Sequence, residues 1–522
     1  MLEKSARSQE ERVNMKTIRK CMNGLLTLLF AMVILNFATA TSRSSKQLLS
    51  SITTIAVASV LFMLALGVQK GFHGSERNQR SFSRIPLIMA LYGVMLYVFA
   101  NIYYKSGSDL WTIDYTAKVL IEEEPYIDWC TEYYSRSPNN IMLTVLYSLV
   151  LRIHSLFGVV DRENPQFTLV AVNCLISCIT VVLVAKILYK LTKDSVTSGI
   201  GIVLSILYFC FNPFNVWPYS DPFSLWIPVS LVAIIVLIEN AYMKIGLFTA
   251  LSIFAAQIKP QNTIPVIALV CLLLIFIDKL VRMKLHKVKV LKCLCSVLVC
   301  GAIMLYGVCS VNWEFSEKVP VDKMKELSFT HFFMMGLNQK SNGGWSGEDV
   351  AFSTSISDPD KRAKANIQEA KRRLSEMGTM GYSRFLWHKL NKLCNNGTLD
   401  YSTSTGDWYD VVYPEKNTLV SPFLRSLYYY DGANYPVYYT AMNILWAFVL
   451  ICCLLASVVN FRENDPIQFW LGISIMGLFL FELLFEAQAR QLYSFMPLFI
   501  LYGVFGINRL VNPNTDRCER IW

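Results

Sequence analysis

The sequence predicts an all-α protein that crosses a membrane many times, and its composition and its apolar runs carry this prediction. Hydrophobic residues make up 54% and charged residues 16% of the 522 residues, whereas soluble chains carry about 25% charged residues. Mean hydropathy is +0.39. Runs close to the roughly 20 apolar residues that a spanning helix needs recur along the chain. This combination excludes a set of soluble domains and a disordered chain.

About twelve apolar runs are expected to cross the membrane. The run 245–258 is shorter than the others. The first run is not expected to be a cleaved signal peptide, because a long charged segment precedes it and no convincing small-residue cleavage site follows. In chain order the runs lie near 21–40, 50–68, 86–103, 166–189, 197–213, 223–242, 245–258, 261–279, 292–312, 436–459, 467–485 and 491–510.

Clusters of Lys and Arg orient these helices. They occur in the N-terminal tail, after the second run, around 186–193, in the loop 279–292 and in the C-terminal tail. Twelve crossings place every cluster on one side, and such loops face the cytoplasm. We therefore expect a multi-pass protein of the cell membrane with both termini cytoplasmic. The net charge of +10 follows from these loops and does not indicate nucleic-acid binding.

One further apolar stretch, 140–157, contains Arg152 and His154. If it crossed the membrane, the basic cluster around 186–193 would move to the outer side. We therefore predict a helix that lies at the outer interface. A true crossing is the alternative.

This topology divides the chain into four parts. Residues 1–84 form a cytoplasmic tail and two additional helices, to which the sequence assigns no task. Residues 85–312 form a transmembrane catalytic core with a first outer loop, 104–165. Residues 313–435 form an extracytoplasmic segment in which the charged amphipathic stretch Asp358–Met377 is expected to be helical. Residues 436–522 form the C-terminal helices and a cytoplasmic tail.

The fourteen cysteines do not indicate a disulfide framework. Most lie inside apolar runs, where cysteine packs as a small hydrophobic residue. No two CxxC motifs face each other, so a zinc site is not expected. Only Cys130 and Cys394 fall in outer segments, and a disulfide between them is the pairing that the sequence leaves open.

Two acidic residues lie where they could carry chemistry. Asp109 follows the run 86–103 by a few residues, at the membrane surface, where it could meet both a lipid head group and a water-soluble acceptor. The alternative is a solvated loop acid. Asp221 ends the outer turn 212–221 and precedes Pro222, so it is also a candidate helix N-cap.

Two cations lie at outer helix ends, against the positive-inside trend. Lys259 precedes Pro260, and Arg490 opens the last run. Binding of a phosphate head group is one reason for such a position, and snorkelling is the alternative. For Arg490, an ion pair with Glu482 or Glu486 competes with phosphate binding.

These residues together suggest one reaction. A lipid phosphate that carries a sugar could be held by Lys259 and Arg490, while Asp109 removes the proton from an acceptor hydroxyl. The cations would stabilise the charge that builds on the leaving phosphate. No nucleotide-binding glycine motif is present.

The order of these motifs resembles the C superfamily of integral-membrane glycosyltransferases (GT-C), which includes the protein O-mannosyltransferases and the aminoarabinose transferases. The bacterial cell-surface branch is the most similar. The resemblance covers roughly residues 85–510. It rests on Ser108-Asp109, Ala117, Tyr133-Tyr134, Ser137-Pro138-Asn139-Asn140, Tyr219-Ser220-Asp221, Lys259-Pro260, Met335-Gly336-Leu337-Asn338 and the stretch from Ala489 to Pro497.

The resemblance implies an inverting transfer of a sugar from a polyprenyl-phosphate donor to a cell-envelope polymer or glycolipid. Asp109 would be the general base, and Asp221 would orient the base or the acceptor. Lys259 and Arg490 would bind the donor phosphate. The acceptor side would include Tyr219, Tyr134 and Asn139.

The sequence departs from this family at one place. Many relatives carry an Asp-Glu pair in the first loop, whereas Leu110 follows Asp109. No metal or other cofactor is therefore indicated, and Asp114 is the alternative base.

Two other functions compete with an enzyme. A membrane transporter or lipid-linked sugar flippase would usually show inverted repeats and charges in mid-membrane, whereas the charges here gather at helix ends and no repeat is evident. A non-catalytic assembly protein would bind a partner through residues 313–435.

Overall fold

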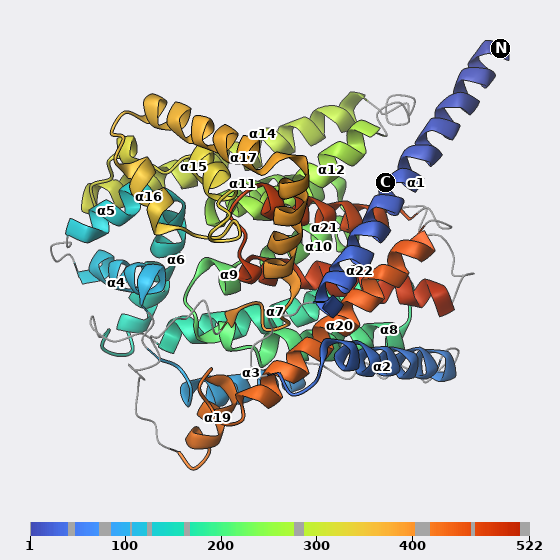
Figure 1. The fold of residues 1–522 in the computed structure, drawn as a ribbon, viewed down its shortest axis with the longest axis horizontal. Helices are drawn as coiled ribbons and strands as arrows, with labels where there is room; N and C mark the ends of the chain where they lie inside the picture. Colours follow the sequence, from blue (N-terminus) through green and yellow to red (C-terminus); the bar gives the residue numbers. More distant parts are fainter. Residues whose placement is uncertain are drawn as a thin grey trace.

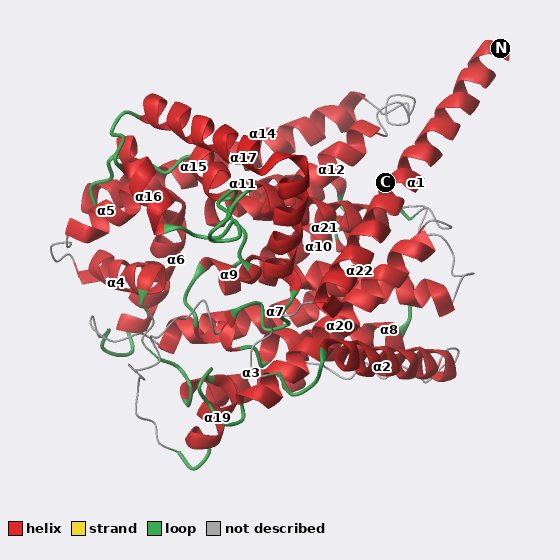
Figure 2. Ribbon diagram, in the orientation of Figure 1, coloured by secondary structure: helices red, strands yellow, loops and turns green. Residues whose placement is uncertain are grey.

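The computed structural model describes residues 2–39, 47–72, 85–104, 107–122, 128–160, 167–275, 287–401, 418–460 and 465–511. These residues form helices joined by turns, and no β-strand occurs among them (Figure 2). The predicted all-α class is confirmed.

Nine helical segments in the described ranges are long and apolar enough to cross a membrane. Three shorter apolar segments occupy the remaining predicted positions: α3 (Ile85–Ala100), α8 with η2 (Ser195–Ser205, Ile206–Cys210), and η4 with α12 (Pro260–Thr263, Ile264–Ile275). A multi-pass helical membrane protein is therefore confirmed. The nine longer segments are α1 (Leu2–Thr39), α2 (Ser51–Phe72), α7 (Phe167–Thr192), α9 with α10 (Ser220–Phe223, Trp226–Leu237), α11 (Ala241–Ile258), α14 (Lys287–Lys318), α20 (Tyr435–Asn460), α21 (Pro466–Leu484), and η7 with α22 (Ala489–Phe495, Met496–Val511).

The core is built by close packing of α20 against α22. A Cβ atom at Gly506 would lie 2.2 Å from Ala456 Cβ, and one at Gly503 would lie 2.8 Å from Cys452 Cβ. Glycine at both positions lets the two backbones approach, as is common between membrane helices. This pair also contacts α1, α2, α7 and α8.

The additional helix α1 is fastened to α20 by polar contacts. The Asn23 amide donates to Asn460 O at 3.1 Å, and Thr27 Oγ1 lies 2.9 Å from Ser457 Oγ. Hydrogen bonds between membrane helices compensate for polar groups that lipid cannot solvate. The helix is therefore part of the bundle, and its first residues extend away from it at the upper right of Figure 1.

The stretch 140–157 forms helix α6 (Ile141–Ser155), which packs against α4 (Ser108–Glu122), α7 and α14. Leu143, Tyr147 and Leu151 are buried at a spacing of four residues, whereas Leu149 and Ile153 are exposed. Fifteen residues fall short of the about 20 that a span needs. Because α3 has only 16 residues, length does not separate the interfacial position of α6 from a true crossing, and both remain predictions.

Helix α14 continues to Lys318, past residue 312, and thus into the segment that is predicted to be extracytoplasmic. This segment contains α15 (Phe329–Met335), α16 (Gly347–Thr354) and α17 (Pro359–Cys394). In Figure 1, α15 and α16 lie on the same side of the molecule as α4 and α5 (Asp128–Arg136), away from the start of α1.

The predicted helix Asp358–Met377 is confirmed. The Asp358 side chain caps its first turn, and the helix breaks at Gly378, which has φ 59° and ψ −178°. The second half of α17 then runs to Cys394 and contacts α1 and α21. Part of the segment 313–435 therefore packs into the helical core.

The disulfide between Cys130 and Cys394 is absent, so that alternative is wrong. Neither cysteine forms a disulfide, and both are buried. Cys130 packs in a small cluster with Tyr134 and Phe315, whereas Cys394 belongs to the main core.

Candidate active site

Five of the predicted residues meet in one place, which we call the polar cluster: Asp109, Tyr219, Asp221, Lys259 and Arg490. The Tyr219 hydroxyl donates to Asp109 Oδ2 at 2.9 Å. Lys259 Nζ binds Asp221 Oδ1, and Arg490 Nη1 donates to Asp221 Oδ2 at 3.3 Å. The Arg490 guanidinium carbon lies 5.1 Å from the centre of the Tyr219 ring. The base candidate and both cations are thus linked through Tyr219 and Asp221.

The turn that carries Tyr219 and Asp221 is fixed from α7. The Asn173 side-chain nitrogen donates to Asn215 O at 3.1 Å and to Trp217 O at 2.6 Å. Trp217 Nε1 donates to the Tyr104 hydroxyl at 3.2 Å. Tyr104 lies shortly before the start of α4 in the chain. These bonds satisfy the free backbone groups of the turn, and they hold Tyr219 in a defined position.

Asp221 does not act as the N-cap of the helix that follows. That place belongs to Tyr219, so the N-cap interpretation is wrong. The Asp221 carboxylate is fully buried, while the Lys259 and Arg490 side chains keep 15% and 21% of their surface exposed. A buried carboxylate requires compensating charge, so Asp221 holds the two cations side by side and leaves part of each accessible to an anion.

Both cations lie where a helix is interrupted. Lys259 adopts an extended conformation between α11 and η4, and Pro260 follows it. Arg490 lies in the 3-10 turn η7 that precedes α22. The Gln261 amide donates to Gln491 O at 2.8 Å, and this bond joins the two turns.

A second buried carboxylate, Glu482, was expected from the sequence only as an alternative ion-pair partner of Arg490. Glu482 is completely buried near the end of α21. With its amide turned so that the nitrogen faces these acceptors, Gln491 donates to Glu482 Oε1 at 2.6 Å and to Gln261 Oε1 at 3.0 Å. The ion pair of Arg490 is therefore with Asp221, and Glu482 instead connects to Gln491. The signal that could have found Glu482 is an acidic residue inside an apolar run, which marks a functional position by default.

Asp109 is half-buried in the first turn of α4 and is surrounded by phenols. Burial and, next, the Asp109 carboxylate raise the pKa of Tyr219 and of Tyr133 well above the ordinary value. Both hydroxyls therefore stay protonated and available as donors. Tyr133, which also accepts a hydrogen bond from the Asn140 amide at 2.6 Å, is a second residue that the site prediction omitted.

Three predicted residues lie outside the polar cluster. Asp114 is buried and pairs with Lys118 Nζ at 2.5 Å, one turn along α4. The Tyr134 hydroxyl lies 2.7 Å from Thr144 Oγ1 in the adjoining apolar cluster. The side chain of Asn139, an exposed residue, donates to Asn140 Oδ1 at 3.3 Å. Of the two candidate bases, Asp109 is the one beside the cations.

The geometry of the cluster suits anion binding together with proton transfer. Two partly exposed cations can bind the oxygens of a phosphate. The Asp109 carboxylate, supported by the Tyr219 hydroxyl, can accept a proton from a neighbouring group. In the described part of the chain, no group of three or more His, Cys, Asp or Glu side chains is arranged to hold a metal ion.

One protein family matches this sequence over residues 12–511, and it is described as a conserved hypothetical integral membrane protein. No curated protein matches the chain, and no solved structure matches it. Because the match extends over nearly the whole sequence, the chain belongs to this family of conserved hypothetical integral membrane proteins.

Proposed function

We propose that the protein is a membrane glycosyltransferase that moves a sugar from a polyprenyl-phosphate donor to a cell-envelope polymer or glycolipid on the outer face of the membrane. One observation carries the proposal. Asp109 and the cation pair Lys259 and Arg490 share a single cluster at helix ends, bridged by the Tyr219–Asp109 and Asp221–cation contacts. The resemblance to the GT-C superfamily supports the same reaction.

In this mechanism the donor phosphate binds the exposed parts of Lys259 and Arg490, which Asp221 holds together. Asp109 accepts the proton of the acceptor hydroxyl. The acceptor oxygen attacks the anomeric carbon on the side opposite the phosphate, so the configuration inverts. The bond between that carbon and the phosphate oxygen breaks, its electron pair leaves with the phosphate, and the two cations stabilise the added charge.

The proposed topology has twelve crossings. The nine spanning-length segments and the three shorter apolar ones would place the polar cluster on the outer face and both termini in the cytoplasm. The three short segments would cross where the bilayer thins locally, which is how a membrane accommodates a hydrophobic stretch shorter than its core. The hydrocarbon tail of the donor would then lie in the bilayer, with its phosphate at the level of the helix ends.

A transporter or flippase for a lipid-linked sugar is the second candidate. It is favoured by the interrupted helices at Lys259 and Arg490, because transporters bind their substrates at such breaks. The two functions differ in their product, since a transporter moves its substrate without changing its covalent structure.

The decisive experiment compares the envelope glycans of cells with and without the protein by mass spectrometry, and then tests Asp109→Asn. A positioned general base contributes about 10²–10⁴-fold to a rate, so the variant should lose that factor while it still inserts and folds. Asp128→Asn, which alters an exposed aspartate at the start of α5, is the matched control. Full transfer by Asp109→Asn would refute the proposal, and flux of an unchanged lipid-linked sugar would favour the transporter.

A further inference from the structure

A buried lysine joins the outer segment to the chain that leads to Arg490. Lys389, on the second half of α17, is completely buried. Its Nζ donates to Gly336 O at 2.7 Å, to Leu483 O at 3.0 Å and to Phe485 O. Gly336 belongs to the outer segment, whereas Leu483 and Phe485 lie at the end of α21. One lysine side chain therefore contacts carbonyls of two distant parts of the chain.

The loop 336–344 lies against the segment 483–487 along more than this one contact. Ala487 N donates to Gly343 O at 2.8 Å, and Lys392 Nζ donates to Ser341 O at 3.0 Å. Ala487 is three residues before Arg490. We call this set of contacts the lysine clamp.

Glycine is required in the loop for the clamp to form. A Cβ atom at Gly343 would lie 2.7 Å from Lys389 Cε, and one at Gly344 would lie 1.7 Å from Lys392 Nζ. A Cβ atom at Gly336 would lie 2.5 Å from Phe485 O. Gly343 also has φ +72°, which favours glycine. The loop therefore has glycine at the positions where the contacts of the clamp leave no room for a side chain.

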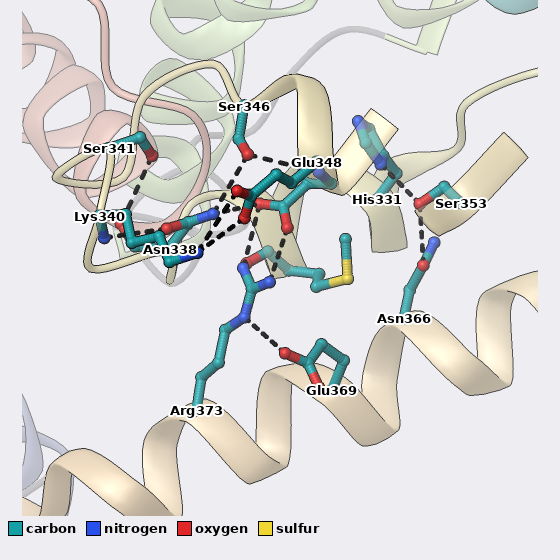
Figure 3. A network of polar contacts seen from close by, with 12 residues as sticks. His331, Asn338, Lys340, Ser341, Ser346, Glu348, Ser353, Asn366, Glu369 and Arg373 are labelled. Atoms are coloured by element: carbon teal, nitrogen blue, oxygen red, sulfur yellow. Dashed lines mark hydrogen bonds and ion pairs between the residues drawn. The ribbon is translucent and has the colours of Figure 1, made fainter. Parts of the chain in front are cut away.

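The outer side of the same loop is tied to α16 and α17 by a second polar network (Figure 3). The Asn338 amide donates to Asp349 Oδ2 at 2.9 Å. Arg373 Nη2 donates to Asp349 Oδ1 at 2.6 Å, and its Nη1 donates to Met334 O at 2.9 Å. Lys340 pairs with Glu348 at 3.0 Å. A continuous set of contacts therefore runs from the outer helices through the loop to the residues before Arg490.

We propose that Lys389 is a positioning residue that locks the outer segment onto residues 483–487 and thereby fixes Arg490 for the anion. The outer segment then influences the anion site through residues 483–487. The identity of the anion as a lipid phosphate rests on the proposed function, whereas the clamp itself does not.

The test uses the full-length protein in detergent and the variants Lys389→Met, Lys389→Arg and Lys392→Met. Hydrogen–deuterium exchange is measured on peptides that cover 336–344 and 483–491, and binding is measured with farnesyl monophosphate as the probe. Lys371→Met, which alters an exposed lysine on the same helix, is the matched control. The apparent melting temperature identifies any variant that fails to fold. If Lys389→Met fails to fold, the exchange and the probe affinity of Lys392→Met are compared with the control instead, because Lys392 is the half-buried lysine of the same clamp.

We expect Lys389→Met to raise exchange in both peptides about tenfold or more, since it removes three hydrogen bonds and the loss of even one changes a local opening equilibrium by up to roughly that factor. It should weaken probe binding by a similar factor, and Lys389→Arg should restore part of both. Arg490→Ala should abolish probe binding without raising exchange in 336–344. Exchange in Lys389→Met no faster than in Lys371→Met, or faster exchange with unchanged probe affinity, would overturn the inference. Absence of probe binding to the unsubstituted protein would instead count against the proposed donor site, and the exchange data would still decide whether the clamp exists.

Discussion

Asp221 is the residue on which the two cations of the site converge. Its carboxylate is fully buried, and it binds Lys259 and Arg490 through separate oxygens. Without this carboxylate the two like charges would repel each other at the edge of the bundle. The residue therefore determines both the stability of the cluster and the distance between its cations.

Asp221→Asn should lower the free energy of unfolding by about 3 kcal/mol, because it removes one partner of a buried ion pair and leaves the other charges uncompensated. Inorganic phosphate should stabilise this variant more than the unsubstituted protein, since a bound anion replaces the lost charge. Apparent melting temperatures with and without phosphate measure both effects, and Asp128→Asn is the control. A variant with unchanged stability and no response to phosphate would show that Asp221 does not hold the cations.

Lys389 gives a second prediction at the scale of single residues, which concerns how the stability of the folded protein depends on pH. Burial, as the largest cause, lowers its pKa from 10.5 to about 7, and Lys392 contributes in the same direction, whereas Glu482 and Glu486 oppose the shift. Between these two values the unfolded chain binds the proton and the folded protein does not, so stability rises with pH by up to about 1.4 kcal/mol per pH unit. Below pH 7 both states are protonated and the dependence ends.

The measurement is the difference in apparent melting temperature between the unsubstituted protein and Lys389→Met from pH 6 to pH 9. Taking the difference cancels the pH dependence that arises from the titratable groups that both proteins share. The difference should stay flat up to about pH 7 and then increase in favour of the unsubstituted protein. A difference that is constant over the whole range would contradict a lowered pKa for Lys389.

At the scale of single elements, α17 is shaped by one glycine. Its first half is a charged amphipathic helix, and its second half enters the core, where Phe385, Lys389 and Leu393 are buried. The change of direction occurs at Gly378, with φ 59° and ψ −178°, a backbone region that is essentially restricted to glycine. Because of this break, one helix contributes both to the contacts with α15 and α16 and to the lysine clamp.

Gly378→Ala should destabilise the protein by about 1–3 kcal/mol through backbone strain alone, because no atom lies within 4 Å of the added Cβ position. Gly381→Ala is the matched comparison, since this glycine is helical and its added Cβ would make an ordinary contact with Met377 at 3.5 Å. That substitution should stabilise by about 0.5–1 kcal/mol. Melting temperatures of the two variants that shift in the same direction would argue against the kink.

At the scale of the whole molecule, the orientation of the bundle decides whether the polar cluster can meet a donor on the outer face. The proposed topology places α17 outside and the turn between α10 and α11 inside. A crossing by α6 would reverse both positions. Orientation is therefore testable at two exposed residues, Lys371 and Glu239.

Lys371→Cys should react with a membrane-impermeant maleimide on intact cells, whereas Glu239→Cys should react only after permeabilisation. The unsubstituted protein supplies the background from its native cysteines. The reverse pattern would place the outer segment in the cytoplasm and would remove the basis for transfer on the outer face.

The sequence by itself was sufficient to locate the long apolar helices and the charged helix after Asp358. Apolar length and charge spacing are local properties, so each predicted run coincides with an apolar helix, and the helix that begins after Asp358 is found in its predicted place. Residue type and position at helix ends were also enough to select Asp109, Asp221, Lys259 and Arg490.

Only the tertiary structure decided which of these residues meet. Asp221 and Arg490 are 269 positions apart in the chain, and no local pattern records a pairing over that separation. The same reason explains why Asp114 pairs with Lys118 while Asp109 meets Tyr219. It also explains why a lysine in a charged segment, Lys389, is buried on carbonyls of α21, since that environment is created by packing and not by neighbours in the sequence.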